Sequence, residues 1–431
     1  MIRPFFNLDE HQTTVRRELT AGLTTFLTMA YIIFVNPNIL SAAGMNKDAV
    51  ITATILASFL GTALAGLWGR VPFAMAPGMG LNAFFAYSLV LGHQINWQTA
   101  LGVVFISGTL FLVLTLLGIR KWIIAAIPLQ LRLATAAGIG LFITFIGFQN
   151  LGMIGDHPVT LVTLATFTPT VALGVVGLVI IVVMEVRKIK GAILAGIIAT
   201  TALGVAFGYV TMPERFFSTP PSLSPVFLKL DIAGALKWSL WGAVFSFMFV
   251  DLFDSLGTIV ACSYEAQMVR ADGSIENIDR VLEADAVATV AGSLLGTSTT
   301  TTYIESGAGI AEGGRTGLTA VTVALLFLAA LLVTPLIAIV PSFATAPALI
   351  VVGIYMFKNI GQIDFTDAEI AIPAFLTMIL MPLTYSISMG LCFGFISFVL
   401  VSVVNGKAGR IHWLMWGIAV LAAVELMLNV T

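Results

Sequence analysis

Long apolar stretches, separated by short polar connections, run along almost the whole chain. A transmembrane helix needs about 20 mostly apolar residues, and most of these stretches reach or approach that length. Two apolar pieces, 77–91 and 304–312, are too short or too rich in glycine to cross a membrane alone. The pattern predicts membrane-spanning helices over 21–40, 49–68, 98–118, 132–151, 168–186, 191–211, 238–262, 281–297, 317–340, 345–357, 369–384, 385–405 and 412–429.

The composition indicates a lipid environment. Hydrophobic residues make up 58% of the 431 residues and charged residues 10%, whereas soluble proteins contain about 45–50% and about 25%. So few charged side chains do not cover the surface of a soluble protein of this length. The net charge of −2 argues against nucleic acid as a partner, which needs a basic field. The two cysteines, Cys262 and Cys392, give neither a disulfide framework nor a metal-binding spacing.

The basic residues predict how the chain is threaded, because Lys and Arg are retained on the cytoplasmic side of a membrane. We count each short apolar piece, with the extended residues before it, as one crossing, and we place the N-terminus in the cytoplasm. Sixteen of the 20 Lys and Arg residues then lie inside. The four outside are Lys47, Arg215, Lys229 and Lys237. This asymmetry predicts a multi-pass protein with a cytoplasmic N-terminus; 412–429 is either a final span or a surface helix.

Three features recur in the same order in the two halves of the chain. Each copy has a pentapeptide of small and apolar residues near a helix end, then a stretch that favours extension, then a Gly-x-Gly that opens a short helix. Seven predicted crossings separate the copies, so the second copy enters the membrane upside down. Such inverted repeats with interrupted segments are typical of secondary transporters with a binding site near the midplane. The paired features are Ser58–Thr62 and Ser293–Thr297, Val71–Met75 and Thr299–Tyr303, and Gly78–Gly80 and Gly307–Gly309.

The two extended stretches predict a short ribbon at the centre of the membrane. Extended backbone in hydrocarbon leaves N–H and C=O groups unpaired unless protein or a water-filled cavity receives them, so we expect the stretches to pair with each other. Each then leads into a half-helix whose N-terminus presents free N–H donors and a partial positive charge. The glycines of both Gly-x-Gly motifs remove side chains where a flat ligand approaches the backbone. Tight packing of helices on small residues is the alternative explanation.

Three carboxylates are the strongest candidates for function. Asp251 and Asp254 are three residues apart in one span and share a helix face, and Glu305 lies where the second extended stretch meets its half-helix. An ionisable group in a span costs about 2.5–3.5 kcal/mol on insertion scales and is functional by default. Carboxylates that share a low-dielectric cavity do not all ionise, so we expect a proton-binding site that also accepts ligand N–H groups. The alternative is a structural acid that accepts bonds from backbone donors at a helix start.

Two further side chains suit a planar heterocyclic ligand. Asn82 lies inside the first half-helix, where its amide offers a donor and an acceptor to the edge of a base. Phe73 is a candidate stacking residue through the repeat symmetry. With 30 phenylalanines in the chain, packing in the apolar core is the more common role for any one of them.

Several motifs resemble those of the AzgA-like purine permeases, which belong to the nucleobase–cation symporter-2 group and are related in fold to the bacterial uracil permease. The resemblance extends from about residue 5 to residue 429. It implies an all-α polytopic membrane protein with about 14 transmembrane segments in two inverted seven-segment repeats, with short central strands before half-helices in segments 3 and 10. The motifs are Thr24–Ile32, Ala76–Phe85, Val250–Thr258, Tyr303–Ser306 and Gly313–Ala320.

The resemblance also implies a function and an assembly. We expect proton-coupled uptake of a purine nucleobase by alternating access, in a homodimer in the bacterial inner membrane, with the proton as coupling ion and without a cofactor, a metal or enzymatic activity. The implied organisation is a cytoplasmic N-terminus (1–20), a core domain (21–118 and 238–340), a gate domain (119–211 and 341–411), an extracellular connection (212–237) and a C-terminal helix (412–431).

The resemblance also implies which residues form the site, through the motifs in which they stand. Asp254, Glu305 and Asn82 are similar to the substrate-binding residues of the eighth, tenth and third segments, and Gly78 and Thr258 match positions near the ligand. The backbone at Ser306 and Gly307 is expected to bind a purine carbonyl. Proton coupling is expected at Asp254, Glu305 and Asp251. In relatives that prefer adenine, the position of Asp251 resembles an Asn and that of Gly78 an Ala. The Asp and Gly here favour guanine and hypoxanthine.

Three alternatives stay open. One is a proton symporter of the same family that prefers adenine. Another is an anion transporter of the same fold, although buried acids repel an anion. The third is a membrane enzyme that uses Asp251 and Asp254 as an acid–base or metal pair. Its further acidic residues, between Glu265 and Asp285, are better interpreted as a solvated linker with a turn at Asp272-Gly273.

Overall fold

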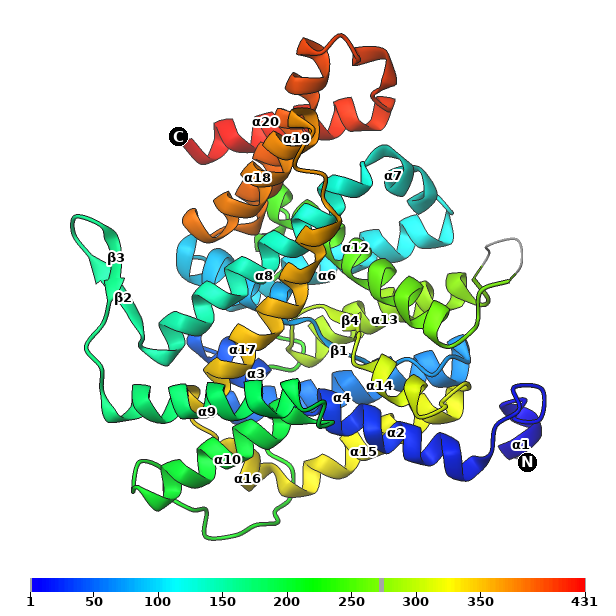
Figure 1. Cartoon of the computed structure of the whole chain (residues 1–431), viewed down its shortest axis with the longest axis vertical. Helices are drawn as coiled ribbons and strands as arrows, with labels where there is room; N and C mark the ends of the chain where they lie inside the picture. The colour runs from blue at the N-terminus through cyan, green and yellow to red at the C-terminus, as the bar shows by residue number, and fades with distance from the viewer. Residues whose placement is uncertain (1, 271–274, 431) are drawn as a thin grey trace.

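The computed structural model describes residues 2–270 and 275–430, most of them in helices (Figure 1). Nine of the described helices are long and apolar enough to span a membrane, and four shorter apolar helices accompany them. The turn expected at Asp272-Gly273 lies outside the described residues. The structure confirms a largely helical, polytopic membrane protein with two short strand pairs.

Most predicted spans correspond to a helix whose ends lie within a few residues of the predicted ones. The first half of the chain forms α1 (Ile2–Phe5), α2 (Val15–Met29), α3 (Ile32–Ala42), α4 (Lys47–Leu64), α6 (Trp97–Leu116), α7 (Arg120–Ala126), α8 (Leu129–Leu151), α9 (Pro169–Val186) and α10 (Ala192–Ala206). The second half forms α11 (Ile232–Ala235), α12 (Trp241–Glu265), α13 (Ile278–Leu295), α15 (Gly317–Ala330), α16 (Thr334–Ala338), α17 (Ser342–Phe357), α18 (Ala368–Leu383), α19 (Ile387–Val404) and α20 (Trp413–Val430).

The expected central ribbon is present, displaced by a few residues in its first strand. β1 (Met75–Pro77) pairs antiparallel with β4 (Thr300–Thr302). β1 leads into α5 (Met79–Ala83), which continues as the π-helix η2 (Phe84–Gly92), and β4 leads into α14 (Ser306–Ala311). The predicted extended stretch ended at Met75, but the strand β1 begins there. The physical reason is that the Thr62 hydroxyl bonds both the N–H and the C=O of Met75 (2.9 and 2.8 Å) and fixes the start of the strand.

The first predicted span, 21–40, is not one continuous helix. α2 ends at Met29 and α3 begins at Ile32, so Ala30 and Tyr31 form a break near the middle of the span. Periodicity alone does not show such a break, because the residues around it are apolar throughout. The π-helix η1 (Ala65–Gly69) extends α4 to the turn at Arg70, whose φ is +54°.

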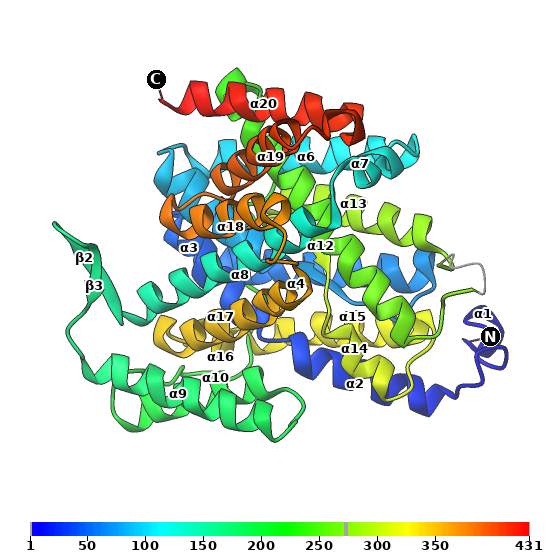
Figure 2. The same ribbon diagram turned by 45° about the horizontal axis from the view of Figure 1, so that its top comes forward.

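The described helices pack in two groups. α2, α3, α4, α6, α13 and α15 pack on one another, as do α8, α9, α10, α17, α18 and α19. In Figure 2, α18 and α19 lie toward the top with α20 along α19, and α9 and α10 lie at the lower left. The predicted core and gate domains concern relative motion as well as packing, and that division stays a prediction.

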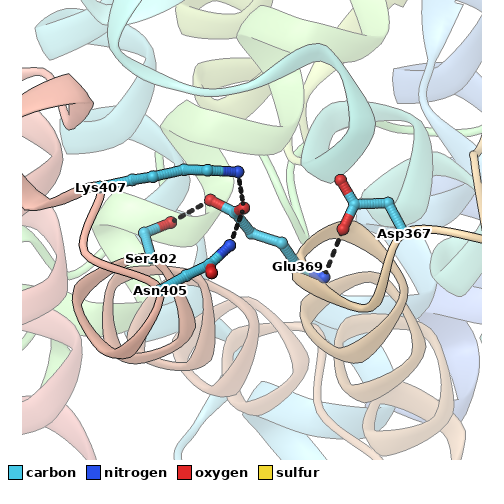
Figure 3. Close-up of polar contacts among 5 residues, drawn as sticks. All are labelled: Asp367, Glu369, Ser402, Asn405 and Lys407. Carbon is cyan, nitrogen blue, oxygen red and sulfur yellow. Dashed lines mark hydrogen bonds and ion pairs between the residues drawn. The ribbon is translucent and has the colours of Figure 1, made fainter.

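A polar cluster joins α18 to α19 at the start of one and the end of the other (Figure 3). The Glu369 carboxylate forms an ion pair with Lys407 and accepts hydrogen bonds from Ser402 (3.2 Å) and Asn405 (2.9 Å). Asp367 caps α18 by accepting the backbone N–H of Glu369 (2.9 Å). The cluster therefore holds these two helices together where their apolar surface ends.

A hairpin that the sequence pattern did not predict follows α8. Its strands, β2 (Ile154–His157) and β3 (Leu161–Leu164), pair antiparallel and project from the end of the molecule opposite the N-terminus (Figure 1). The side chains of β3 are exposed, so no alternation of buried and exposed residues marks it.

Candidate functional site

The central ribbon places the two half-helices at its opposite ends. Register pairs Met75 with Thr302 and Pro77 with Thr300. Two further backbone bonds lengthen the pairing, from Gly78 N to Thr299 O and from Tyr303 N to Ala74 O, both 2.9 Å. Because the strands are antiparallel and each half-helix directly follows its strand, α5 and α14 leave the ribbon in opposite directions. This is the arrangement expected of two inverted repeats that meet at one site.

Glu305 is positioned by the break between α2 and α3. It stands at the N-cap of α14, partly exposed, and Tyr31 donates a hydrogen bond from its hydroxyl to Glu305 Oε1 (2.5 Å). Tyr303, two residues earlier, donates to the carbonyl of Pro77 (2.5 Å) and so fixes the crossing of the two strands. The sequence motif located Glu305 but gave no sign of Tyr31 as its partner.

Asn82 lies on α5 with its side chain fully buried. Its Oδ1 accepts a hydrogen bond from Ser298, which stands just before β4. Its Nδ2 has no hydrogen-bond partner among the described residues. Since a buried amide donor without a partner costs free energy, this nitrogen is suited to donate to a ligand acceptor.

The two aspartates of α12 differ in their surroundings. Asp254 is partly exposed, and its charge lies within interaction range of Glu305 and Tyr303. Asp251 is fully buried, and Thr289 of α13 donates to its Oδ2 (3.0 Å). Asp251 is therefore turned toward α13, whereas the charge of Asp254 acts on Glu305 and also on Asp251 and Asp285. That Asp254 and Glu305 form one binding site stays a prediction.

Asp285 corrects the interpretation of the acidic segment. We expected it to belong to a solvated linker, but it is fully buried in α13 and accepts a hydrogen bond from Thr302 of β4 (3.2 Å). The sequence did contain a sign of this burial. Asp285 falls inside the predicted span 281–297, and an acid in a span is functional by default. With Asp251 it places a second pair of carboxylates behind the ribbon.

The remaining predicted residues surround the ribbon. Thr258 lies one turn after Asp254 and is partly exposed. Ser306 is buried, and its Oγ accepts the N–H of Ala74 (3.0 Å). The N–H groups of Ser306 and Gly307 donate within the turn, to the carbonyls of Tyr303 (3.1 Å) and Ile304 (2.9 Å). Their expected role in binding a purine carbonyl stays a prediction, and it requires this turn to open.

Phe73 and Gly78 are both fully enclosed. Phe73 is 0% exposed and packs in an apolar cluster with Val71, Phe111 and Leu252. Its role as a stacking residue stays a prediction. Gly78 lies against β4, where an added Cβ would be 3.0 Å from Thr301 Oγ1. Among the described residues, no group of three or more His, Cys, Asp or Glu side chains could hold a metal ion.

One basic residue lies beside the helix that carries Asp254. The guanidinium of Arg132, in the first turn of α8, lies 5.5 Å from the centre of the Phe253 ring. Phe253 directly precedes Asp254, so a helix of the second group meets α12 beside the candidate site. A cation over an aromatic face contributes about 0.5–2 kcal/mol.

Comparison with known proteins agrees with this geometry. Residues 16–393 match a family model described as "Permease family". The guanine/hypoxanthine permease PbuG of Bacillus subtilis is 44% identical over 431 residues, 97% of this chain and 98% of the relative. The adenine permease AdeQ of Escherichia coli is 42% identical over 424 residues, 98% of this chain and 95% of the relative.

Among solved structures, the transmembrane domain of the cyanobacterial bicarbonate transporter BicA superposes with a TM-score of 0.67 at 17% identity, covering 88% of this chain and 97% of that domain. This likeness shows the inverted-repeat fold and nothing about the cargo. The relatives are named permeases, that is, transporters rather than enzymes. The chain belongs to the permease family, as an AzgA-like member of the nucleobase–cation symporter-2 group.

Proposed function

We propose that this protein takes up guanine or hypoxanthine together with a proton. The observation that carries the proposal is the β1–β4 ribbon, which leads into the half-helix of Asn82 on one side and the half-helix after Glu305 on the other. The helix that carries Asp254, α12, packs against β4 and both half-helices. Two carboxylates accept N–H groups of a purine, and the Asn82 amide donates to a ring nitrogen or carbonyl. The family and its full-length guanine/hypoxanthine and adenine relatives support a nucleobase as the cargo.

In the proposed transport cycle, protonation of the site permits the loaded core to move. A bare carboxylate costs about 2.5–3.5 kcal/mol in a membrane span, so protonation favours movement of the loaded site past the gate. The core, roughly 21–118 and 238–340, then slides or rocks against the gate, roughly 132–211 and 345–405. Without a proton and a purine, this movement is suppressed. We further propose a homodimer in the bacterial inner membrane with the N-terminus in the cytoplasm, in agreement with the basic residues.

Two alternative cargoes are adenine and an inorganic anion. An adenine-preferring symporter is favoured by the 42% identity to AdeQ, but the Gly78 and Asp251 of this chain favour guanine and hypoxanthine. An anion transporter is suggested by the likeness to BicA, but the carboxylates at the site repel anions. Equilibrium binding of hypoxanthine, adenine and sulfate to the purified protein separates the three.

Uptake of radiolabelled guanine, competed by unlabelled purines, tests the proposal. A protonophore is expected to abolish accumulation against a gradient, and Asp254→Asn is expected to do the same while the protein still reaches the membrane. The exposed Glu214→Gln on a connecting loop serves as the matched control. Accumulation by Asp254→Asn at the wild-type level would show that Asp254 does not couple the proton to transport.

A further inference from the structure

A small cavity joins the candidate site to the second group of helices. It has a volume of about 140 Å³ and is lined on one side by Thr28, Glu305 and Ala308. On the other side it is lined by Glu185 of α9, by the start of α10 and by Tyr355 of α17. A cavity of this size has room for several water molecules. Glu305 therefore shares a cavity with a carboxylate from the opposite group of helices.

Four polar side chains lie in or beside this cavity: Tyr31, Glu305, Glu185 and Tyr355. Glu305 is held by the Tyr31 hydroxyl on the core side (2.5 Å). The hydroxyl of Tyr355 lies beside the Glu185 carboxylate, and the charge of Glu185 acts on Glu305. Both carboxylates line one cavity with room for water, and a proton passes between such groups through a direct hydrogen bond or through one water molecule. The pair is therefore arranged to exchange a proton between the two groups of helices.

The charged groups around Glu185 leave it available for this exchange. Lys190, in the connection after α9, forms an ion pair with Glu312 at the end of α14. The ammonium of Lys358 lies 4.9 Å from the centre of the Tyr355 ring. Helix α10 contains no ionisable side chain, and Arg187 and Lys188 are exposed at the end of α9. Glu185 itself stands in the last turn of α9 and is partly exposed, directly before the basic residues that are expected to lie in the cytoplasm.

We propose that Glu185 receives the transported proton from Glu305 and releases it to the cytoplasm, with Tyr355 orienting its carboxylate. In this step the carboxyl O–H bond of Glu305 breaks and an O–H bond forms on Glu185, directly or through water in the cavity. Glu305 is left as a carboxylate that accepts the Tyr31 hydroxyl. Glu185 then loses the proton to cytoplasmic water and is ready for the next cycle. This inference rests on the proposed function.

Proteoliposomes with defined internal and external pH separate this role from purine binding. Glu185→Gln is expected to lower the initial rate of hypoxanthine uptake driven by a pH gradient by at least about tenfold. Exchange of internal for external hypoxanthine at equal pH is expected to stay within about twofold of wild type, because exchange requires no net proton release. The wild-type rate falls as the internal pH falls, and the variant loses this dependence.

Three matched variants complete the test. Glu185→Asp keeps the carboxylate and is expected to restore most of the driven uptake. Tyr355→Phe keeps the ring and is expected to lower driven uptake less than Glu185→Gln does. Glu10→Gln removes an exposed acid near the N-terminus and is expected to change neither assay. If Glu185→Gln cannot be reconstituted, driven uptake and equal-pH exchange are compared in Tyr355→Phe instead. Driven uptake at the wild-type rate in Tyr355→Phe then overturns the proposal.

The outcomes that contradict the proposal are distinct from failure of the proposed function. Driven uptake by Glu185→Gln at the wild-type rate shows that the proton takes another route. Equal loss of driven uptake and exchange shows that Glu185 supports the structure or the purine site instead. If the wild-type protein itself does not take up hypoxanthine in response to a pH gradient, the proposed function is wrong, whatever the variants do.

Discussion

Gly78 stands between the first strand and its half-helix, where the chain lies against the opposite strand. A Cβ built there would be 3.0 Å from Thr301 Oγ1 and 3.1 Å from Thr301 Cγ2. These distances are shorter than ordinary van der Waals contact, so the Thr301 side chain has to give way. A methyl group at this position therefore changes the local shape between β1 and β4.

Gly78→Ala is expected to shift the purine preference toward adenine, because the added methyl group presses on Thr301 and narrows the space at the start of the half-helix that carries Asn82. We expect the KM for guanine to rise about three- to tenfold while the protein reaches the membrane normally. Competition of labelled guanine uptake by adenine and by hypoxanthine measures the shift. Gly257→Ala, which adds a methyl group in open space on α12, is the control. If adenine and hypoxanthine compete with guanine uptake in Gly78→Ala as they do in the wild type, Gly78 does not determine the purine preference.

At the scale of elements, one buried carboxylate joins the first helix of the first repeat to a helix of the second. Glu18 in the first turn of α2 is 0% exposed. It accepts the backbone N–H groups of Arg315 (3.0 Å) and Thr316 (3.2 Å). It also accepts the hydroxyls of Thr316 (2.9 Å) and Thr319 (2.6 Å). Glu18 therefore satisfies the donors at the start of α15, a role usually filled by a residue of the same helix.

Glu18→Ala is expected to destabilise the protein by about 3 kcal/mol or more, because it leaves several buried donors at the start of α15 without an acceptor. Thermal unfolding of the purified protein in detergent measures the loss. Glu10→Ala, at an exposed site, is expected to leave the unfolding temperature unchanged. Equal unfolding temperatures for Glu18→Ala and wild type would mean that water or another group replaces the carboxylate.

At the scale of the whole molecule, two polar bridges join the helix groups at the end away from the small cavity. Asn38 of α3 donates to Thr345 of α17 (3.1 Å), and Asn150 of α8 donates to Tyr87 of η2 (2.8 Å). These side chains also line a second cavity of about 250 Å³ between the groups. If the groups move against each other during transport, these bridges must break in each cycle.

A cross-link between Asn38→Cys and Thr345→Cys is therefore expected to stop transport. A short bifunctional maleimide is expected to reduce uptake by the double variant at least about tenfold, while each single variant keeps its activity after the same treatment. The native Cys262 and Cys392 are buried, which limits reaction elsewhere. Full uptake by a protein shown to be cross-linked would exclude relative motion at this interface.

The sequence alone determined the features that depend on local composition. Helix lengths, the inverted repeat, the two interrupted segments and the acids Asp254 and Glu305 follow from apolar length, glycine spacing and the rarity of charge in a span. The sequence also placed Asp285 inside a span, although we interpreted its segment as a solvated linker. Local patterns carry this information because a membrane constrains each crossing segment separately.

Only the tertiary structure decided which distant side chains meet. It brings Tyr31 to Glu305, Thr302 to Asp285 and Glu18 to the start of α15, and it places Glu185 of the other helix group at the cavity of Glu305. No spacing along the chain encodes these meetings, because each depends on how two helices far apart in sequence turn their faces toward one another when they pack.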